Sequence, residues 1–384
     1  MEIAEFKGAF GKLVEKEDVE HGKYVSFMPN KLPPSLEFTN KLVLALSKAD
    51  STLSKLSGAG LLLPNPNLLI IPYLKKEALS SSRIEGTRIS LSDYFISEAQ
   101  GIKKEDLEAK EVGNYIDAIN YAMDKIKTEQ IDLPLIKKMH KILMKDVRGN
   151  ELLPGEFRPV QNWIGPPNTK IKDATFVPPP KDDVPQLMQE IIDYINTYDE
   201  IPLLIKCALI HYQFETIHPF CDGNGRIGRA LITLYLCKKN KISKPLLYAS
   251  DYFEKHRREY YDTLLMTNKT GKFENWIAFF LEAIKVQSED SLDRTIKIEH
   301  LREEYQKKIR AKQKQVTSLL DIVDSLFINP FIQINQISEK LDVTYPTAKK
   351  FVDILIKLQI LKIAGKKERN KLFVAHEILN IITV

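Results

Sequence analysis

With 384 residues, 43% of them hydrophobic, the chain is long enough for two or three domains with real cores. Its 56 basic and 51 acidic residues leave a net charge of +5, too mild at this length to require nucleic acid as a partner. The three cysteines Cys207, Cys221 and Cys237 are odd in number and lack paired spacing, which argues against a disulfide framework and fits a reducing cytosol. The start of the chain has no charged-then-apolar signal, and no run of about 18 apolar residues occurs. We therefore expect a cytoplasmic protein with no membrane partner.

The first part of the chain is predicted to be mainly helical. Residues 1–35 are polar and irregular, and the Leu-Pro-Pro-Ser run at 32–35 interrupts the chain. Apolar residues then recur at spacings of three and four over residues 36–56, which is typical of an amphipathic helix. Residues 1–110 are therefore expected to form a helical N-terminal region.

One stretch of this region, KEALSSSRIEG at residues 76–86, places hydroxyl and acidic groups close together. Ser81 and Glu85 are four residues apart and so share one face of a helix. Taken alone, the simpler interpretation is a serine-rich turn, or a solvated glutamate that pairs with Arg88, because most surface charges contribute little.

The middle of the chain alternates predicted helices with one predicted hairpin. His140 lies in a helical pattern with no acidic or cysteine partner at i+4, which favours a packed histidine over a metal ligand. Residues 160–177 mix aromatic and aliphatic side chains with glycine and proline, and they end in three prolines at 178–180. This pattern predicts a short β-hairpin. Helical periodicity follows over 184–198 and 203–214.

Twelve residues at 218–229, HPFCDGNGRIGR, bring together a base, a carboxylate, turn glycines, an amide and two guanidiniums. The glycines allow a tight turn, and the apolar helix predicted to follow offers free N–H groups and the positive end of its dipole to an anion. Arg226 and Arg229 share a helix face and can grip phosphate oxygens. Asp222 could hold a Mg²⁺ that bridges phosphates, and His218, with an ordinary pKa near ~6.5, suits proton removal from a hydroxyl. The pattern predicts chemistry on a nucleotide phosphate.

Two other motif classes do not fit this stretch. No GxxxxGK[ST] loop occurs in the chain, and His218, Cys221 and Asp222 lack a second pair of ligands at zinc-finger spacing. The stretch instead resembles the signature of the Fic family, HPFx[DE]GNGRxxR, with no departure at the defining positions. The resemblance implies an enzyme that transfers AMP from ATP, with Mg²⁺ or Mn²⁺ as cofactor, to a Ser, Thr or Tyr hydroxyl of a target protein or of itself.

The resemblance also implies roles for individual residues. His218 is expected to be the catalytic base and Asp222 the metal ligand, and residues 160–178 are expected to form the flap that aligns the target segment by strand pairing. Tyr260 and Asn268 are expected to hold the adenosine end. The residues expected to contact the nucleotide are Glu85, Ala174, Thr175, Phe176, His218, Asp222, Gly223, Asn224, Gly225, Arg226, Ile227, Gly228, Arg229, Tyr260 and Asn268.

Given this signature, the SSSRIEG stretch at residues 80–86 has a second interpretation. It resembles the inhibitory motif [ST]xxxE[GN] of the family, matched at Ser81, Glu85 and Gly86. The resemblance implies that Glu85 reaches Arg229, where its carboxylate would occupy the place of the ATP γ-phosphate. We therefore expect an enzyme that its own N-terminal segment restrains.

The end of the chain is predicted to be a separate small domain. Residues 287–315 are highly charged and fit a solvated connecting helix, whereas residues 316–384 show two helical runs followed by two short strands around a basic turn, which resembles a winged helix. Nine basic and seven acidic residues in this last part leave a surplus of two. DNA contact by Lys349, Lys350 and the wing therefore competes with a protein-binding or dimerisation module.

The expected fold is all-α, a Fic-fold helical core with a short β-hairpin flap, plus a small α+β winged-helix domain. The expected divisions are a helical N-terminal region at 1–110, the catalytic core at 111–286, the connecting helix at 287–315 and the last domain at 316–384. Three other activities stay open: removal of AMP from a modified protein by the same site, transfer of phosphate or phosphocholine, and a nucleotide-sensing transcriptional regulator. A homodimer also stays open.

Overall fold

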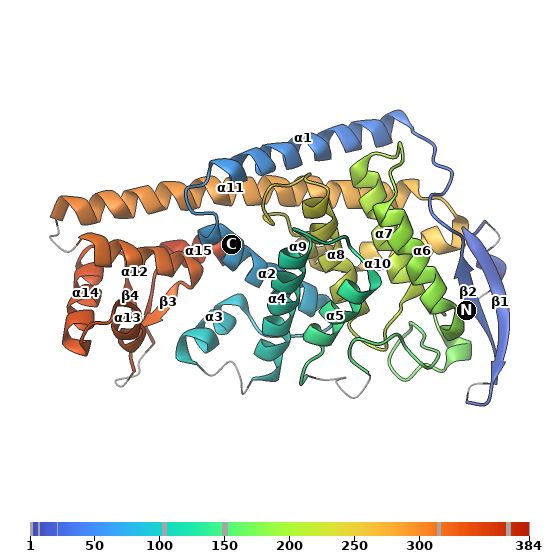
Figure 1. The fold of residues 1–384 in the computed structure, drawn as a ribbon, viewed down its shortest axis with the longest axis horizontal. Helices are drawn as coiled ribbons and strands as arrows, with labels where there is room; N and C mark the ends of the chain where they lie inside the picture. Colours follow the sequence, from blue (N-terminus) through green and yellow to red (C-terminus); the bar gives the residue numbers. More distant parts are fainter. Residues whose placement is uncertain are drawn as a thin grey trace.

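The structure, a computed structural model, describes residues 3–6, 8–20, 22–101, 106–147, 153–312, 316–365 and 370–383. Helices dominate these residues, and the strands form two small antiparallel sheets, so the predicted all-α class with a small α+β unit is confirmed. None of the helices in these ranges is long and apolar enough to cross a membrane. The β1–β2 hairpin and the C-terminal elements lie at opposite ends of the molecule (Figure 1).

The core is built around two helices that are buried on nearly every side, α7 (Leu203–Ile217) and α8 (Asn224–Lys238). A helix that is apolar all round belongs in the middle of a bundle. The surrounding helices are α1 (Asn40–Leu62), α2 (Asn67–Ile84), α3 (Leu91–Gln100), α4 (Leu107–Lys125), α5 (Leu133–Leu143), α6 (Val184–Asn196), α9 (Ser250–Lys255) and α10 (Arg257–Thr270).

Helix α11 (Glu274–Lys312) is one continuous helix of 39 residues, or about 58 Å at 1.5 Å per residue. Helix α1 runs alongside its first part (Figure 1). The predicted boundary at 286 between catalytic core and connecting helix falls inside α11. The apolar stripe of its second half is not solvated as expected, because Ile298, Tyr305 and Ile309 are fully buried.

The N-terminal segment contains a regular hairpin where the sequence analysis expected irregular structure. Strands β1 (Gly11–Asp18) and β2 (Gly22–Pro29) follow a short 3-10 turn (Ile3–Phe6) and pair antiparallel, with Gly11 opposite Pro29 and Asp18 opposite Gly22. Gly22, at φ 67, begins the second strand in the left-handed conformation that glycine adopts without cost. The prediction was wrong because β1 has only Leu13 and Val14 among charged residues, and the buried Phe27 of β2 packs on Phe176, which is distant in the sequence.

The predicted flap hairpin is less regular than expected. Within residues 160–178 the structure has one isolated antiparallel bridge, between Ile164 and Phe176, which exchange hydrogen bonds of 2.8 and 3.0 Å. Pro166, Pro167 and the 178–180 prolines have no N–H to donate, so a longer ladder cannot form here. The segment is a loop pinned by one pair of residues.

The C-terminal unit has the element order helix, strand, helix, helix, strand, strand, followed by a short helix. Its elements are α12 (Val316–Ile328), β3 (Phe331–Gln333), α13 (Ile334–Leu341), α14 (Tyr345–Lys357), β4 (Lys362–Ala364), β5 (Leu372–Val374) and a last helix α15 (His376–Thr383). The sheet has the order β3-β5-β4. The predicted basic turn at 366–369 lies outside the described residues. The unit docks on the N-terminal region, where Lys75 Nζ donates to the Ile328 carbonyl at 3.2 Å.

Candidate active site

The predicted signature forms the turn between the two central helices. His218 follows the last residue of α7 in the left-handed conformation, at φ 51, and Gly223, at φ 78, leads into α8. The Asn224 side chain closes the turn, because its Oδ1 accepts from the Phe220 amide and its Nδ2 donates to the Phe220 carbonyl, both at 2.8 Å. The first turn of α8, whose N–H groups have no acceptor within the helix, therefore begins directly after the turn that contains His218, where an anion could bind.

Phe220 anchors the turn in the core. It is fully buried and stacks on His140 with ring centroids 3.8 Å apart. His140 Nδ1 accepts from the Gly155 amide at 2.8 Å, so its Nε2–H donates to the Asp222 carbonyl at 2.9 Å. Burial lowers the pKa of His140 to about 4, which keeps the ring in this neutral form. His140 is a packed support of the turn, as the sequence suggested.

Arg158 is a second support of the turn. Its side chain is buried, and its Nε donates to the His218 carbonyl at 3.0 Å. Its terminal nitrogens donate to the carbonyls of Val160 and Pro179, at the two ends of the flap. One guanidinium therefore fixes the catalytic turn and the flap relative to each other.

Replacing Arg158 with Lys should loosen both segments, because an ammonium cannot reproduce three divergent hydrogen bonds. We expect the free energy of unfolding to fall by about 2 kcal/mol, and the AMP transfer that the signature implies to fall about tenfold. Urea unfolding and a transfer assay measure the two effects. Lys181→Ala is the matched control, because Lys181 donates to the nearby Pro159 carbonyl from an exposed position. Equal effects of both substitutions would contradict the role of Arg158.

A cavity of about 580 Å³ opens beside the turn, within the size range of ligand pockets. His218, Gly225 and Arg229 lie on its wall together with Glu85 from the end of α2. The flap and α10 supply the other side. The remaining lining residues are Trp163, Ile164, Gly165, Pro166, Thr175, Phe176, Glu215, Thr216, Tyr261, Asp262, Leu264, Leu265 and Asn268. The cavity thus joins an anion site, a base and an apolar wall.

Arg229 is held by the N-terminal region in the way that the inhibitory motif implies. Its buried guanidinium donates to Ser81 Oγ and to the Ser81 carbonyl, each at 2.9 Å, and to Glu85 Oε1 at 2.7 Å. Burial acts to raise the pKa of the Glu85 carboxyl, but the charge of Arg229 outweighs burial and holds this pKa below its usual value. A Cβ at Gly225 would lie 2.3 Å from Glu85 Oε1, so the carboxylate occupies the first turn of α8 itself. Gly86, also part of the motif, follows in the left-handed conformation at φ 107.

His218 faces the same cavity. Burial lowers the pKa of His218 to about 4, and Arg158 acts in the same direction. A ring with this pKa is neutral at pH 7 and can accept a proton. The arrangement therefore places a neutral base and an anion site on one wall.

Asp222 is the residue on which a metal ion was expected. Its side chain is 45% exposed, and its Oδ1 accepts from the Gly223 amide at 2.5 Å and from Arg226 at 3.4 Å. In the described part of the chain, no cluster of three or more histidine, cysteine or acidic residues could bind a metal ion. A single accessible carboxylate suits Mg²⁺, which takes one or two carboxylates and fills its shell with water and substrate phosphates.

Not every residue expected to contact the nucleotide lies at the cavity. Thr175, Phe176 and Asn268 line it, whereas Ala174 packs behind the flap and Ile227 and Gly228 face the core. Asn224 is engaged in the turn. Arg226 is 5% exposed and faces Asp222 and Met144.

Tyr260 is also outside the cavity. It is buried among aromatic rings, and its hydroxyl bonds His211 Nε2 at 2.8 Å. The neighbouring Tyr261 lines the cavity in its place. Successive helix residues point about 100° apart, and a Tyr-Tyr pair gives no sign of which ring faces inward.

Glu215 was missed as a site residue. It lines the cavity one helix turn before His218, and its Oε1 has no hydrogen-bond partner within the described residues. Burial raises the pKa of Glu215 to about 7. A Cβ at Gly228 would lie 2.2 Å from this carboxyl, which explains a glycine in mid-helix. An acidic residue three places before the base was the available signal.

Two family models match the chain, the Fic/DOC family over residues 130–236 and the Fic/DOC family N-terminal region over residues 43–124. The chain belongs to the Fic family. It is 30% identical over 99 residues to a probable protein adenylyltransferase of Aquifex aeolicus, covering 26% of this chain and 31% of that protein. It is 28% identical over 198 residues to the protein adenylyltransferase Fic of Drosophila grimshawi, covering 51% of this chain and 35% of that protein. The chain thus spans about a third of the length of these curated relatives.

Solved structures share the fold. A Fic family protein from Desulfovibrio desulfuricans superimposes with a TM-score of 0.56 at 18% identity, covering 90% of this chain and 98% of the other. Fic-1 of Caenorhabditis elegans superimposes with a TM-score of 0.52 at 22% identity, covering 67% of this chain and 74% of the other. At these identities the likeness concerns the fold.

Proposed function

We propose that the protein is an adenylyltransferase that moves AMP from ATP to a Ser, Thr or Tyr hydroxyl of a target protein. The observation that carries the proposal is the shared wall of the cavity, where His218 lies beside the first turn of α8 and Arg229. Relatives named protein adenylyltransferases match 99 and 198 residues of the chain. The phosphates of ATP would lie on the amides at the start of α8, with Arg229 on the γ-phosphate.

In the reaction, His218 takes the proton of the target hydroxyl as its oxygen attacks the α-phosphorus in line. The bond from the α-phosphorus to the bridging oxygen breaks, and pyrophosphate leaves. Asp222 would hold Mg²⁺ or Mn²⁺, which neutralises phosphate charge when bound. The adenosine would lie between the flap and α10, near Phe176, Tyr261 and Asn268.

Glu85 restrains this chemistry in the proposal. Its Oε1 lies 2.7 Å from a terminal nitrogen of Arg229, and its negative charge repels the γ-phosphate that Arg229 would otherwise bind. ATP can then bind only with its α-phosphate turned out of line, and losses of positioning cost orders of magnitude in rate. Withdrawal of Glu85 would release the enzyme.

ATP carrying the label on either the α- or the γ-phosphate tests the proposal. Incubated with cell extract, the enzyme should transfer the α-label and never the γ-label, and mass spectrometry should find AMP on a hydroxyl side chain. Transfer of the γ-label would instead mean phosphate transfer. Loss of AMP from an already modified protein would mean that the site runs in reverse, with Glu85 assisting in the same cavity.

The pH profile offers a separate check on His218 as the base. With a pKa of about 4, His218 stays neutral down to about pH 5, and removing the Glu85 carboxylate cannot raise this pKa. We therefore expect kcat/KM of the Glu85→Gly variant to show no decline due to His218 between pH 7.5 and 5.5. Glu215→Gln in the same variant removes any effect of the carboxyl that titrates at about 7. A tenfold fall per pH unit below 6.5 that persists without Glu215 would contradict the assignment.

A further inference from the structure

The N-terminal hairpin packs against the back of the flap, outside both regions that the family models match. The Phe27 amide of β2 donates to the Val177 carbonyl at 2.9 Å, so one backbone hydrogen bond joins β2 to the end of the flap. Phe27 is fully buried, with its ring centroid 5.7 Å from that of Phe176. Phe176 in turn lines the nucleotide cavity. Only one side chain therefore separates the hairpin from the cavity.

The same apolar cluster reaches the opposite wall. Phe6, Phe27 and Phe176 form a small core of their own, and Leu265 of α10 packs against it. Leu265 is also a cavity-lining residue. The hairpin thus joins the flap to α10, the two sides between which the adenosine would lie.

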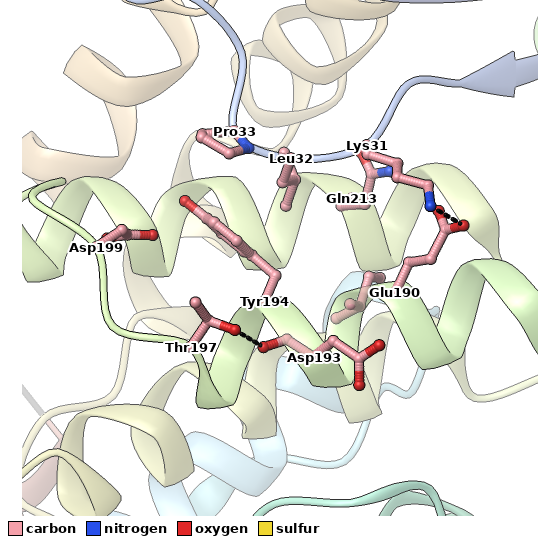
Figure 2. Close-up of a pocket in the computed structure, with 10 residues that line it drawn as sticks. Lys31, Leu32, Pro33, Glu190, Asp193, Tyr194, Thr197, Asp199 and Gln213 are labelled. Carbon is pink, nitrogen blue, oxygen red and sulfur yellow. Dashed lines mark hydrogen bonds and ion pairs between the residues drawn. The ribbon is translucent and has the colours of Figure 1, made fainter.

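The two residues that follow β2 connect the hairpin to helices α6 and α7. The Gln213 side chain of α7 donates to the Asn30 carbonyl at 2.9 Å, and Lys31 pairs with Glu190 of α6 at 3.0 Å. Figure 2 shows this link, where the chain after β2 crosses α6 and α7 above a cavity of about 310 Å³. The support is therefore fixed to the helix that ends at His218.

We propose that the β1–β2 hairpin holds the flap in register with His218 and that Phe27 is a positioning residue for transfer to protein. The inference rests on the proposed function. One isolated bridge pair leaves the flap without a regular strand ladder. Its position therefore depends on contacts from outside, namely the hydrogen bonds of Arg158 and the fully buried Phe27 that packs on Phe176.

The flap carries a natural reporter. The chain has two tryptophans, of which Trp163 lies in the flap and Trp276 is fully buried in the core. In a Trp276→Phe variant, acrylamide quenching reports on Trp163. We expect Phe27→Ala to increase quenching at least twofold and to speed amide exchange of residues 160–178 at least tenfold, with exchange in α7 unchanged. Phe27→Leu should restore most of the protection, and Glu17→Ala, exposed on the same hairpin, should change neither readout.

Activity completes the test. In the Glu85→Gly background, Phe27→Ala should lower α-label transfer to extract proteins at least tenfold, while the Kd for ATP changes less than threefold. Unchanged exchange in the flap would overturn the inference, and so would equal losses of ATP affinity and transfer. If no variant transferred AMP at all, the proposed function would fail, but the quenching and exchange results would still decide the role of Phe27.

Discussion

The Glu85→Gly variant is expected to transfer AMP at least ~10²-fold faster than the unmodified chain, because losses of positioning of this kind cost about that much. Without the carboxylate, Arg229 is free to hold the γ-phosphate, and the first turn of α8 opens to the phosphates. The rise should appear mainly in kcat, since misplaced ATP still occupies the cavity. Initial rates with α-labelled ATP over a range of ATP concentrations measure it.

Two further variants distinguish the effect of the Glu85 charge from the effect of the space that its side chain occupies. Glu85→Gln keeps the shape of the side chain and removes its charge, so its rate should fall between those of the unmodified chain and Glu85→Gly. Ser81→Ala removes only the 2.9 Å bond from Arg229 Nε and should activate severalfold at most. An unchanged rate in Glu85→Gly would refute the inhibitory role even if the enzyme were active.

Replacement of His218 is expected to abolish transfer in the activated background, with a loss of about 10³-fold or more. Two other buried imidazoles, His140 and His211, cannot take its place, because both ring nitrogens of each are already engaged in hydrogen bonds. The measurement is again α-label transfer, now comparing Glu85→Gly with the double variant.

The backbone at His218 decides which substitution is informative. At φ 51, alanine would strain the turn, whereas asparagine tolerates this conformation. His218→Asn should therefore lose transfer while ATP affinity stays within about threefold. If His218→Asn kept substantial activity and only His218→Ala lost it, the residue would serve the turn rather than the chemistry.

What could be predicted depended on how local each feature is. Residues 218–229 predict a phosphate site because base, carboxylate, glycines and arginines are contiguous in the chain. Glu85 was found only through a second motif, since nothing in its own neighbourhood indicates a partner at Arg229. The helical core followed from the spacing of apolar residues, and α6 and α7 form where this spacing predicted helices at 184–198 and 203–214.

Features built from distant segments could not be predicted. The strands β1 and β2 contain charged residues, and the partner that buries Phe27 is Phe176, which no local pattern connects to it. Tyr261 rather than Tyr260 reaches the cavity because of the exact rotation of α10. Arg158 shows its role only once His218, Val160 and Pro179 are seen around it.

The ion pair between Glu85 and Arg229 determines how activity should depend on protein concentration. Both residues belong to one chain, so the carboxylate is present at the site at a fixed effective concentration, whatever the amount of protein. Diluting the unmodified chain should leave its activity per molecule unchanged, whereas an inhibitor supplied by another chain would dissociate. If Glu85 inhibits as proposed, the resting state is thus a property of each single molecule.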